Sequence, residues 1–348
     1  MQKQFTKDRT NIVKGLAIIF LLIYHLFENE NLVTSLGVNY SPFALSDFLM
    51  FTGFGNICVA VFVFLTGYGI TKGLYAQGEI SAKEAYRQAT KRFFTLMGNF
   101  AVMYLSINLL WWSYFDYGSL YERGKQGVLH ALTDMTGLSV FLDTPTLNMT
   151  WWYMELAYIL IFLIPALAYL TKKVGYPVIL LALFAPGVMS MGEDLTRYLF
   201  TAVLGVAAAY GNWPDKLLNL KWNSIVRWIV GIVVLVLSIL IRQNAAVKIS
   251  YLHLIDAPIA LVLVYVGAVL LASVPFVNKV LEFIGKHSMN IYLVHTFFYM
   301  MLWQKFIYQF KYAPLILVVL LVVCLLYSVV LELVKKGVRI LYKRIRKK

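Results

Sequence analysis

Long apolar stretches recur throughout this chain and constrain its fold more than any other feature. Hydrophobic residues make up 60% of the 348 residues and charged residues only 14%, against about 25% charged residues in a soluble domain. A stretch of roughly 17–25 apolar residues can cross a bilayer as an α-helix. The sequence therefore predicts an all-α, polytopic membrane helix bundle of about ten transmembrane helices. They are expected near residues 10–28, 48–70, 93–113, 150–171, 176–192, 196–211, 225–242, 254–274, 289–309 and 314–334.

The distribution of charge indicates which side of the membrane each loop faces. The first predicted external loop is acidic and the next, internal loop is basic: Glu28, Glu30 and Asp47 precede Lys72, Lys83, Arg87, Lys91 and Arg92. Because Lys and Arg accumulate in cytoplasmic loops, both termini are expected in the cytoplasm. The net charge of +14 then requires no nucleic acid partner. The basic C-terminal tail is expected to face anionic membrane lipid.

The chain is expected to form a single integral-membrane domain, residues 1–348, without a fused extracytoplasmic domain. No small-residue cleavage site follows the first apolar stretch, so we expect that helix to be retained. The polar stretch 114–149 is too short to fold alone and is interpreted as a long outer loop. Cys58 and Cys324 both fall in predicted spans. They are interpreted as small core residues rather than as a disulfide or a metal site.

Lys14 and His25 are the most informative polar residues, because they interrupt the apolar stretch NIVKGLAIIFLLIYHLF. A lysine at the centre of a membrane helix costs roughly 2.5–3.5 kcal/mol, so such a residue is a candidate functional group. On an α-helix their spacing separates the two α-carbons by roughly 16 Å along the axis and about 20° in azimuth. Both side chains are therefore predicted on one face of the first helix, half a bilayer apart.

Glu155 is a candidate partner for His25 near the outer face. It lies about one turn into the fourth predicted helix, at a depth similar to that of His25. If the two helices are neighbours, a carboxylate–imidazole pair would fix the tautomer and raise the basicity of a general base. An interhelical hydrogen bond with a purely structural role is the equal alternative.

Lys91 and Arg92 are predicted to open the third helix, in KRFFTL, and to join Lys14 at the inner rim of the membrane. Three cations there would suit a phosphate-bearing ligand, and Arg92 could hold two oxygens at once. The alternative for Lys91 and Arg92 is that they flank the helix at the cytoplasmic interface and fix its orientation in the membrane. The alternative for Lys14 is that its ammonium extends to the nearby membrane surface.

Weaker candidates complete the set of polar residues. His295 either lines an interior cavity or is a core histidine, and Tyr68 lies between Gly67 and Gly69, a pair typical of a helix end or of close packing. His130 and His253 are expected at the surface. The histidines show no metal-binding spacing, so we expect no metal site, and the sequence contains no Gly-x-Ser-x-Gly elbow.

Four blocks, in order, resemble a known family. KGLAIIFLLIYH is similar to an Arg-x10-His signature, with Lys14 where arginine is usual, and VFVFLTGYGI resembles a Phe-Phe-x-x-Ser-Gly-Phe block, with Thr66 at the serine position. KRFFTL and WWYMELAYIL resemble Arg-Arg-x-x-Arg-Leu and Trp-Phe/Tyr-x-x-x-Glu blocks, and GKHSMNIYLVHTFF is similar to a Gly-x-x-Ser-x-x-Ile-Tyr-Leu-x-His end. The chain thus resembles the integral-membrane enzymes of acyltransferase family 3, which includes O-acetyltransferases of bacterial surface polysaccharides.

The resemblance implies an enzyme that takes an acetyl group from acetyl-coenzyme A on the cytoplasmic side. It would deliver that group to a hydroxyl of a lipid-linked or nascent surface polysaccharide, such as a capsule, O-antigen or exopolysaccharide, at the bacterial plasma membrane. His25 would then be the base or a transient acyl carrier and Glu155 its partner. The donor would be held by Lys14, Lys91 and Arg92, with Tyr68, Trp152 and His295 as candidate cavity residues. Lysine at position 14 keeps the charge of arginine but loses its bidentate fork.

Two other classes of membrane protein remain as alternatives. A transporter or flippase for a glycolipid or small anion also carries buried charges, but it predicts broken helices at corresponding positions of two halves. No convincing pair of such helices is visible. A polysaccharide polymerase would be expected to have a large outer loop rich in arginine, whereas residues 114–149 contain only Arg123 and Lys125 as cations.

Overall fold

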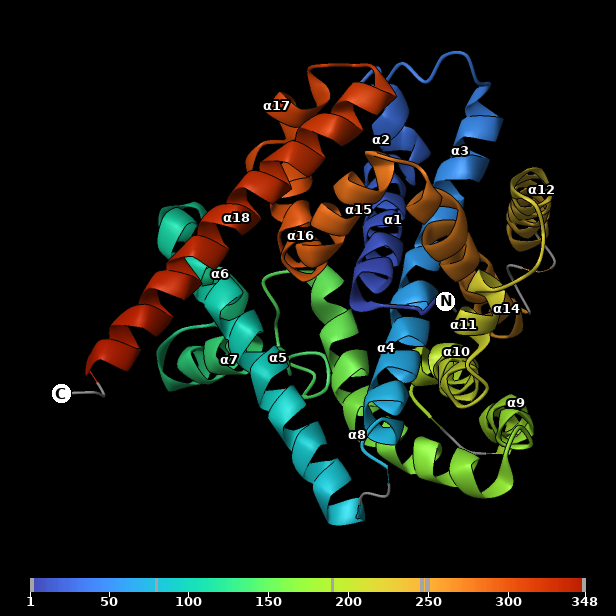
Figure 1. The fold of residues 1–348 in the computed structure, drawn as a ribbon. Helices are drawn as coiled ribbons and strands as arrows, with labels where there is room; N and C mark the ends of the chain where they lie inside the picture. The colour runs from blue at the N-terminus through green and yellow to red at the C-terminus, as the bar shows by residue number, and fades with distance from the viewer. Residues whose placement is uncertain (1–2, 79–80, 189–190, 245–246, 248–250, 346–348) are drawn as a thin grey trace. The chain divides into compact units, whose positions relative to one another are not determined.

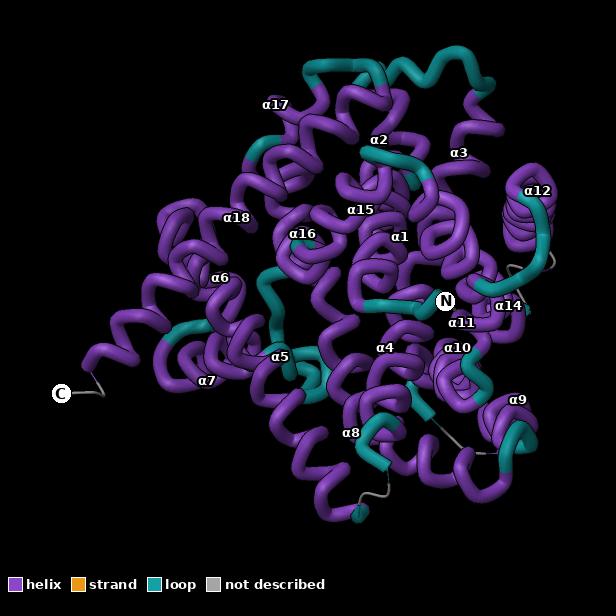
Figure 2. Tube along the Cα trace, viewed as in Figure 1, coloured by secondary structure: helices purple, strands orange, loops and turns teal. Residues whose placement is uncertain are grey.

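The computed structural model describes residues 3–78, 81–188, 191–244, 247 and 251–345. These residues are helical and form no strand apart from one isolated bridge between Asn39 and Tyr312, as the tube in Figure 2 shows. An all-α fold is therefore confirmed. The chain divides into two compact units, each assembled from separate segments. Unit 1 comprises residues 1–28, 43–95 and 153–286, and unit 2 comprises residues 29–42, 96–152 and 287–348.

Unit 1 contains most of the long helices and all of the polar groups that the sequence places around Lys14 and His25. Its elements are α1 (Lys7–Phe27), α3 (Leu45–Phe54), the short η1 (Gly55–Ile57), α4 (Cys58–Tyr75), the first part of α5 (Ala82–Trp111), α8 (Tyr153–Val174), α9 (Val178–Val188), α10 (Glu193–Tyr210), α11 (Trp213–Leu218), α12 (Ser224–Gln243), α14 (Leu252–Tyr265) with its continuations η4 (Val266–Leu270) and η5 (Leu271–Ser273), and α15 (Val277–Lys286). Figure 1 labels the α-helices of this set.

Helix α4 packs against α1, α8, α10 and α14 within unit 1. Its contact with α10 depends on two glycines, because a Cβ at Gly67 would overlap the carbonyl of Ala202 and one at Gly205 would overlap the carbonyl of Phe64. Small residues let membrane helices approach closely and gain van der Waals contact. Gly67 lies in the middle of α4, which runs from Cys58 to Tyr75. The prediction that this glycine belongs to a helix end was wrong.

Helix α1 is held against α15 by a reciprocal pair of glycines. A Cβ at Gly15 would overlap the Leu281 carbonyl, and a Cβ at Gly285 would overlap the Asn11 carbonyl. The two helices thus run antiparallel with their backbones in direct contact. This contact fixes one side of the helix that carries Lys14 and His25.

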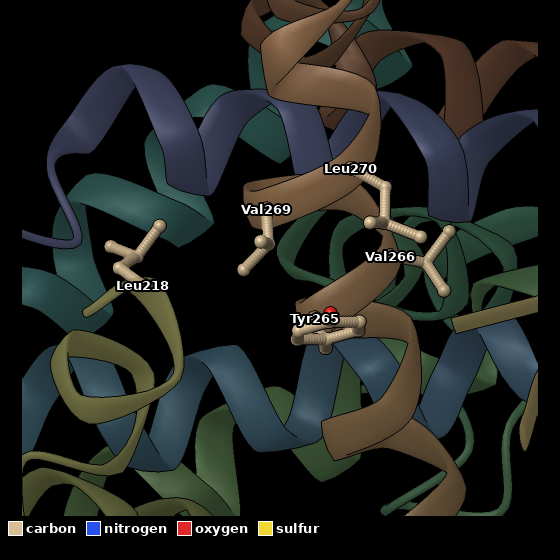
Figure 3. Packing of buried hydrophobic residues seen from close by; sticks show 5 residues of the cluster. All are labelled: Leu218, Tyr265, Val266, Val269 and Leu270. Carbon is tan, nitrogen blue, oxygen red and sulfur yellow. The ribbon is translucent and has the colours of Figure 1, made fainter. Parts of the chain in front are cut away.

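A cluster of buried apolar residues lies in unit 1 where α11 packs against α14 and η4. Figure 3 shows four of its residues on one helical segment and one on α11: Tyr265, Val266, Val269, Leu270 and Leu218. Leu16 of α1 and Phe5, just before α1, pack against this cluster. The N-terminal segment is also hydrogen-bonded to the same region, since the Phe5 amide donates to Asp215 Oδ1 at 2.6 Å.

Unit 2 consists of shorter helices and one long C-terminal helix. Its elements are α2 (Glu30–Ser35), the rest of α5, η2 (Trp112–Tyr114), α6 (Tyr117–Tyr121), α7 (Gly124–Thr136), η3 (Met149–Trp152), α16 (Ser288–Thr296), η6 (Phe297–Leu302), α17 (Gln304–Tyr308) and α18 (Ala313–Ile345). Helices α16 and α18 share a polar contact in which His287 Nδ1 lies 2.7 Å from Ser328 Oγ.

The segment 114–149 is structured around a buried carboxylate instead of forming an open loop. Asp134 is 1% exposed and accepts hydrogen bonds from the Tyr121 hydroxyl at 2.5 Å, the Leu147 amide at 2.7 Å and the Thr146 hydroxyl at 2.8 Å. His130 is also buried, with Nδ1 3.2 Å from the Tyr121 carbonyl. The expectation of a surface histidine at this position was wrong, because α7 turns His130 inward.

In the part of the chain that the structure describes, seven helices are long and apolar enough to cross a membrane by length and composition. They are Lys7–Phe27, Leu45–Tyr75, Ala82–Tyr114, Met149–Val174, Ser224–Gln243, Leu252–Ser273 and Ala313–Val338. Three expected spans fall outside this set: α9 and α16 are short, and α10 carries Glu193, Asp194 and Arg197 in its first turns. A count of about ten stays a prediction, as does the side on which the termini lie.

Candidate functional site

Lys14 and His25 lie on one uninterrupted helix. The periodicity of an α-helix therefore places both residues on the same face. Helix α1 begins after the N-cap Thr6, whose hydroxyl accepts from the Arg9 amide, and ends at Phe27. Lys7 lies two turns before Lys14 on the same face. This face of α1 therefore carries two cations toward its beginning and one imidazole near its end.

His25 meets a carboxylate on its own helix. Its Nδ1 lies 3.4 Å from Oε1 of Glu28, the C-cap residue of α1, and both side chains are partly exposed. The Tyr24 ring stands edge-on to the imidazole, with centroids 5.1 Å apart. A carboxylate on the Nδ1 side favours a proton on that nitrogen, which leaves Nε2 as the basic one. Glu28 is not among the partners predicted from the sequence, which assigns it to a loop, although its i, i+3 spacing from His25 is visible there.

Glu155 lies elsewhere in unit 1. It is in the first turn of α8, which packs against α4 and α10, and its charged neighbour is Asp194 of α10. Among the described residues, no ion pair joins Glu155 to His25. The partnership of these two residues stays a prediction.

A network of charged residues that the sequence analysis did not single out lies in the same unit. Arg242 of α12 holds Asp256 of α14 through two hydrogen bonds, Nε to Oδ1 at 2.8 Å and Nη2 to Oδ2 at 3.2 Å. Arg197 of α10 lies 3.7 Å from the same carboxylate and donates to Asn56 Oδ1 at 3.0 Å. Asp256 is fully buried, so its charge requires these cations.

Lys14 is half-buried and its electrostatic neighbour is the like-charged Lys7. In the described ranges, the Lys14 ammonium makes no ion pair and no hydrogen bond. A cation drawn into the protein without an anion is suited to an anionic ligand, because burial without a partner is costly.

Lys91 and Arg92 occupy a different position from the one expected. Helix α5 begins at Ala82, so the two residues lie inside the helix instead of opening it, and both are exposed. The polar first turns, with Lys83, Glu84 and Arg87, are helical although they are too charged to lie in a bilayer. Arg92 extends toward α4. Its Nη2 lies 3.5 Å from the position that a Cβ would take at Gly73 of that helix.

Tyr68 is buried in the middle of α4 and stands edge-on to Phe5, with ring centroids 5.2 Å apart. Its hydroxyl has no hydrogen-bond partner among the residues that the structure describes. A buried hydroxyl without a partner is unfavourable unless a water or ligand satisfies it. Tyr68 is therefore consistent with a residue that lines a polar cavity.

The two other candidate cavity residues belong to unit 2. His295 is fully buried in α16, with Nδ1 2.7 Å from the Tyr292 carbonyl and its ring stacked on Tyr299. Trp152 ends η3 and is half-buried. Cys58 and Cys324 are both buried and not disulfide-bonded, which confirms their interpretation as core residues. Among the described residues, no group of His, Cys, Asp and Glu is arranged to hold a metal ion.

Comparison with known proteins identifies the family. A family model described as an acyltransferase domain, of acyltransferase family 3, matches residues 8–333. No curated protein and no solved structure gives a significant match. The match begins in the first turn of α1 and ends within α18, so it covers Lys14, His25, Glu155 and both units. With its membrane-length helices, this multi-pass membrane chain belongs to acyltransferase family 3.

Proposed function

We propose that this chain is an O-acetyltransferase of a bacterial cell membrane. It moves an acetyl group from cytoplasmic acetyl-coenzyme A to a hydroxyl of a surface glycan, such as a capsule, O-antigen or exopolysaccharide unit. The observation that carries the proposal is the arrangement along α1. A half-buried lysine without an anionic partner lies roughly 16 Å along the helix from an imidazole with a carboxylate at its Nδ1 side.

Each end of α1 has a distinct chemical role in this proposal. Lys14 binds a phosphate of the donor, assisted by Arg92 and Lys91 as exposed cations. His25 removes the proton from the acceptor hydroxyl while the hydroxyl oxygen attacks the thioester carbonyl. The carbon–sulfur bond breaks, and the coenzyme A thiolate leaves and takes up the proton. Glu28 orients the imidazole and stabilises its protonated form.

Glu155 acts as a second acidic residue in the proposed site. Its charged neighbour is Asp194, and we assign it to binding the acceptor, whose hydroxyl groups can donate to carboxylates. Direct transfer to a lipid-linked or nascent polysaccharide is the simplest route. The alternative functions, transport and polymerisation, require no base at His25. They therefore predict that a His25→Ala chain keeps its transport or polymerisation activity.

The proposal is tested by deleting the gene from its host and restoring it in wild-type or variant form. Proton NMR of the surface polysaccharide then reports the O-acetyl signals. We expect the wild type to restore these signals, and we expect His25→Ala to restore none above the deletion strain. His253→Ala is the matched control, because His253 lies in the first turn of α14, away from α1. If the deletion strain retains every acyl group, the function is wrong. If His25→Ala restores full acetylation, the site is wrong.

The two carboxylates are compared in full-length chains reconstituted in lipid nanodiscs, where the transfer rate and the KM values can be measured. Glu28→Gln is expected to lower the transfer rate about tenfold or more, because it removes the charge that supports the imidazole. Glu155→Gln is expected to raise the KM for the acceptor and to leave the KM for acetyl-coenzyme A unchanged. The reverse pattern would identify Glu155, and not Glu28, as the partner of His25.

A further inference from the structure

We infer that Arg197 is a positioning residue for the proposed transfer, because it ties α10 and α14 to the end of α1 that carries His25 and Glu28. This inference rests on the proposed function, since it assigns Arg197 a role in that reaction. Arg197 does not touch His25 in the described contacts. Its influence is transmitted through Asn56 and Tyr24.

The position of the Arg197 guanidinium is set by a buried ion pair. Its Nη2 lies 3.7 Å from Oδ2 of Asp256, and that carboxylate is held on its other side by Arg242. The exposed fraction is 0% for Asp256 and 2% for Arg242. Arg242 also lies over the Phe54 ring, at 5.9 Å from its centroid. The anchor of Arg197 therefore sits in a packed interior where side chains have little freedom.

From this anchor, Arg197 extends to α1 through η1. Its Nη2 donates to Asn56 Oδ1 at 3.0 Å, and η1 packs against α1. The approach is close, because a Cβ at Gly55 would overlap the Phe20 carbonyl and meet Tyr24 Cβ at 3.0 Å. The Tyr24 hydroxyl has Glu28 and Asn56 as electrostatic neighbours, and the Glu28 amide donates to the Tyr24 carbonyl at 2.8 Å. The contacts thus run from Arg197 through Asn56 and Tyr24 to Glu28.

The end of α1 needs an external support of this kind. The last turn of a helix lacks intrahelical partners for its carbonyls and frays readily. His25 and Glu28 both belong to this last turn. Their side chains lie 3.4 Å apart, and the Tyr24 ring stands edge-on to His25 and has Glu28 as an electrostatic neighbour.

Arginine suits this position for a geometric reason. One nitrogen, Nη2, faces both acceptors, the Asp256 carboxylate at 3.7 Å and the Asn56 amide oxygen at 3.0 Å, and the rigid, planar guanidinium holds it there with less conformational freedom than a lysine ammonium has. A glutamine would lose the charge. Because misplacement by about 1 Å can lower a rate by about 100-fold, loss of the Arg197 contact is expected to lower the rate without altering donor binding at Lys14.

The test measures acetyl transfer by the full chain reconstituted in lipid nanodiscs, with acetyl-coenzyme A as donor and the isolated polysaccharide as acceptor. We expect Arg197→Gln to lower kcat between about 10- and 100-fold and to leave the KM for acetyl-coenzyme A within about twofold. Asn56→Ala should lower kcat to a similar extent, and it leaves the buried ion pair intact. We expect the double variant to be no slower than Arg197→Gln alone, since both act through one path. Arg197→Lys should recover only part of the rate.

Tyr75→Phe supplies the matched control. The Tyr75 hydroxyl donates to the Ala168 carbonyl at 2.7 Å, far along α4 from Asn56, so its effect should multiply independently with that of Arg197→Gln. The inference is overturned if the Arg197 and Asn56 effects also multiply independently, or if Arg197→Gln lowers only the amount of folded protein while kcat per folded molecule is unchanged. A wild-type chain without transfer, or an active His25→Ala chain, would instead overturn the proposed function.

Discussion

Arg242 and Asp256 form a two-point ion pair in the interior of unit 1, with Nε to Oδ1 at 2.8 Å and Nη2 to Oδ2 at 3.2 Å. Arg242 lies near the end of α12, and Asp256 lies in the second turn of α14. The pair joins these two helices and anchors Arg197. The ion pair fixes how the two helices are oriented more than it adds to stability, because desolvation offsets much of the attraction between buried charges.

Removing one member of this pair should destabilise unit 1 strongly. Arg242→Met leaves the buried Asp256 carboxylate with Arg197 alone, at 3.7 Å, and we expect a loss of about 3–5 kcal/mol. The double variant Arg242→Met/Asp256→Leu should recover part of this loss, since the fully buried carboxylate is removed as well and the remaining Arg197 is partly exposed. Thermal unfolding of the detergent-solubilised chain measures both. Lys286→Ala, which removes a solvent-exposed ion pair with Glu282, is the control and should change the unfolding midpoint little, because exposed ion pairs contribute little to stability. Equal losses for the single and double variants would contradict this account.

The glycine contact between α1 and α15 should not tolerate even a methyl group. Gly285→Ala places a Cβ on the Asn11 carbonyl, so the helices must separate, and we expect a loss of about 1–3 kcal/mol. Gly69→Ala is the matched control, because nothing lies within 4 Å of its added Cβ. That change should be neutral or slightly stabilising. Unfolding midpoints measured side by side decide the matter, and equal midpoints for the two variants would refute the close contact.

Lys14 is expected to act on donor binding rather than on the chemical step. Lys14→Gln should raise the KM for acetyl-coenzyme A about tenfold, the loss of one charge-assisted hydrogen bond, with kcat nearly unchanged. Lys14→Arg should retain the wild-type KM or lower it, since a guanidinium can hold two phosphate oxygens. Lys173→Gln is the control, because Lys173 lies over the Tyr169 ring in the last turns of α8. A kcat effect without a KM effect would remove Lys14 from the donor site.

The buried carboxylate of Asp134 should make the stability of unit 2 depend on pH. Burial raises the pKa of Asp134 above its ordinary value, although hydrogen bonds from Tyr121 and its neighbours oppose the shift. A raised pKa means that the folded chain holds the proton more tightly than the unfolded chain. The stabilisation is therefore present below the ordinary aspartate pKa of about 4 and is lost as the pH rises through the raised value.

The Asp134→Asn variant checks this assignment. Its amide group cannot accept from every donor that surrounds the carboxylate, so we expect a loss of about 1–3 kcal/mol. The part of the pH dependence that belongs to Asp134 should also disappear. Thermal unfolding at a series of pH values between about 4 and 8 measures both effects, and an unchanged pH profile in the variant would show that another group is responsible. Asp116→Asn, at an exposed N-cap, serves as the control.

The sequence predicted the helical membrane class and the pairing of Lys14 with His25 on one face, because both depend on local properties. It was less successful at helix limits. Helix α5 continues back to Ala82, since hydropathy marks the portion in the bilayer and not the full helix. Because hydropathy marks only this portion, Lys91 and Arg92 were predicted at the start of a helix and Gly67 at the end of one.

The charged network was partly accessible from sequence as well. Arg197, Arg242 and Asp256 interrupt or border predicted apolar helices, so the criterion that selected Lys14 also applies to them. Their pairing was not accessible, because it requires the packing of α10, α12 and α14 to be known. His130 illustrates the same point, since a polar residue in a presumed loop gave no indication that α7 would bury it.

What the sequence alone determined is the set of groups along α1, because one helix fixes the spacing and azimuth of its own residues. The contact between His25 and Glu28 is also local, because the two residues are three positions apart at the end of that helix. Contacts with other helices were decided by tertiary structure: Arg197 reaches Asn56 because Gly67 and Gly205 let α4 and α10 approach closely. Contacts between segments distant in the chain depend on which helix faces meet, and that choice depends on packing across the whole unit.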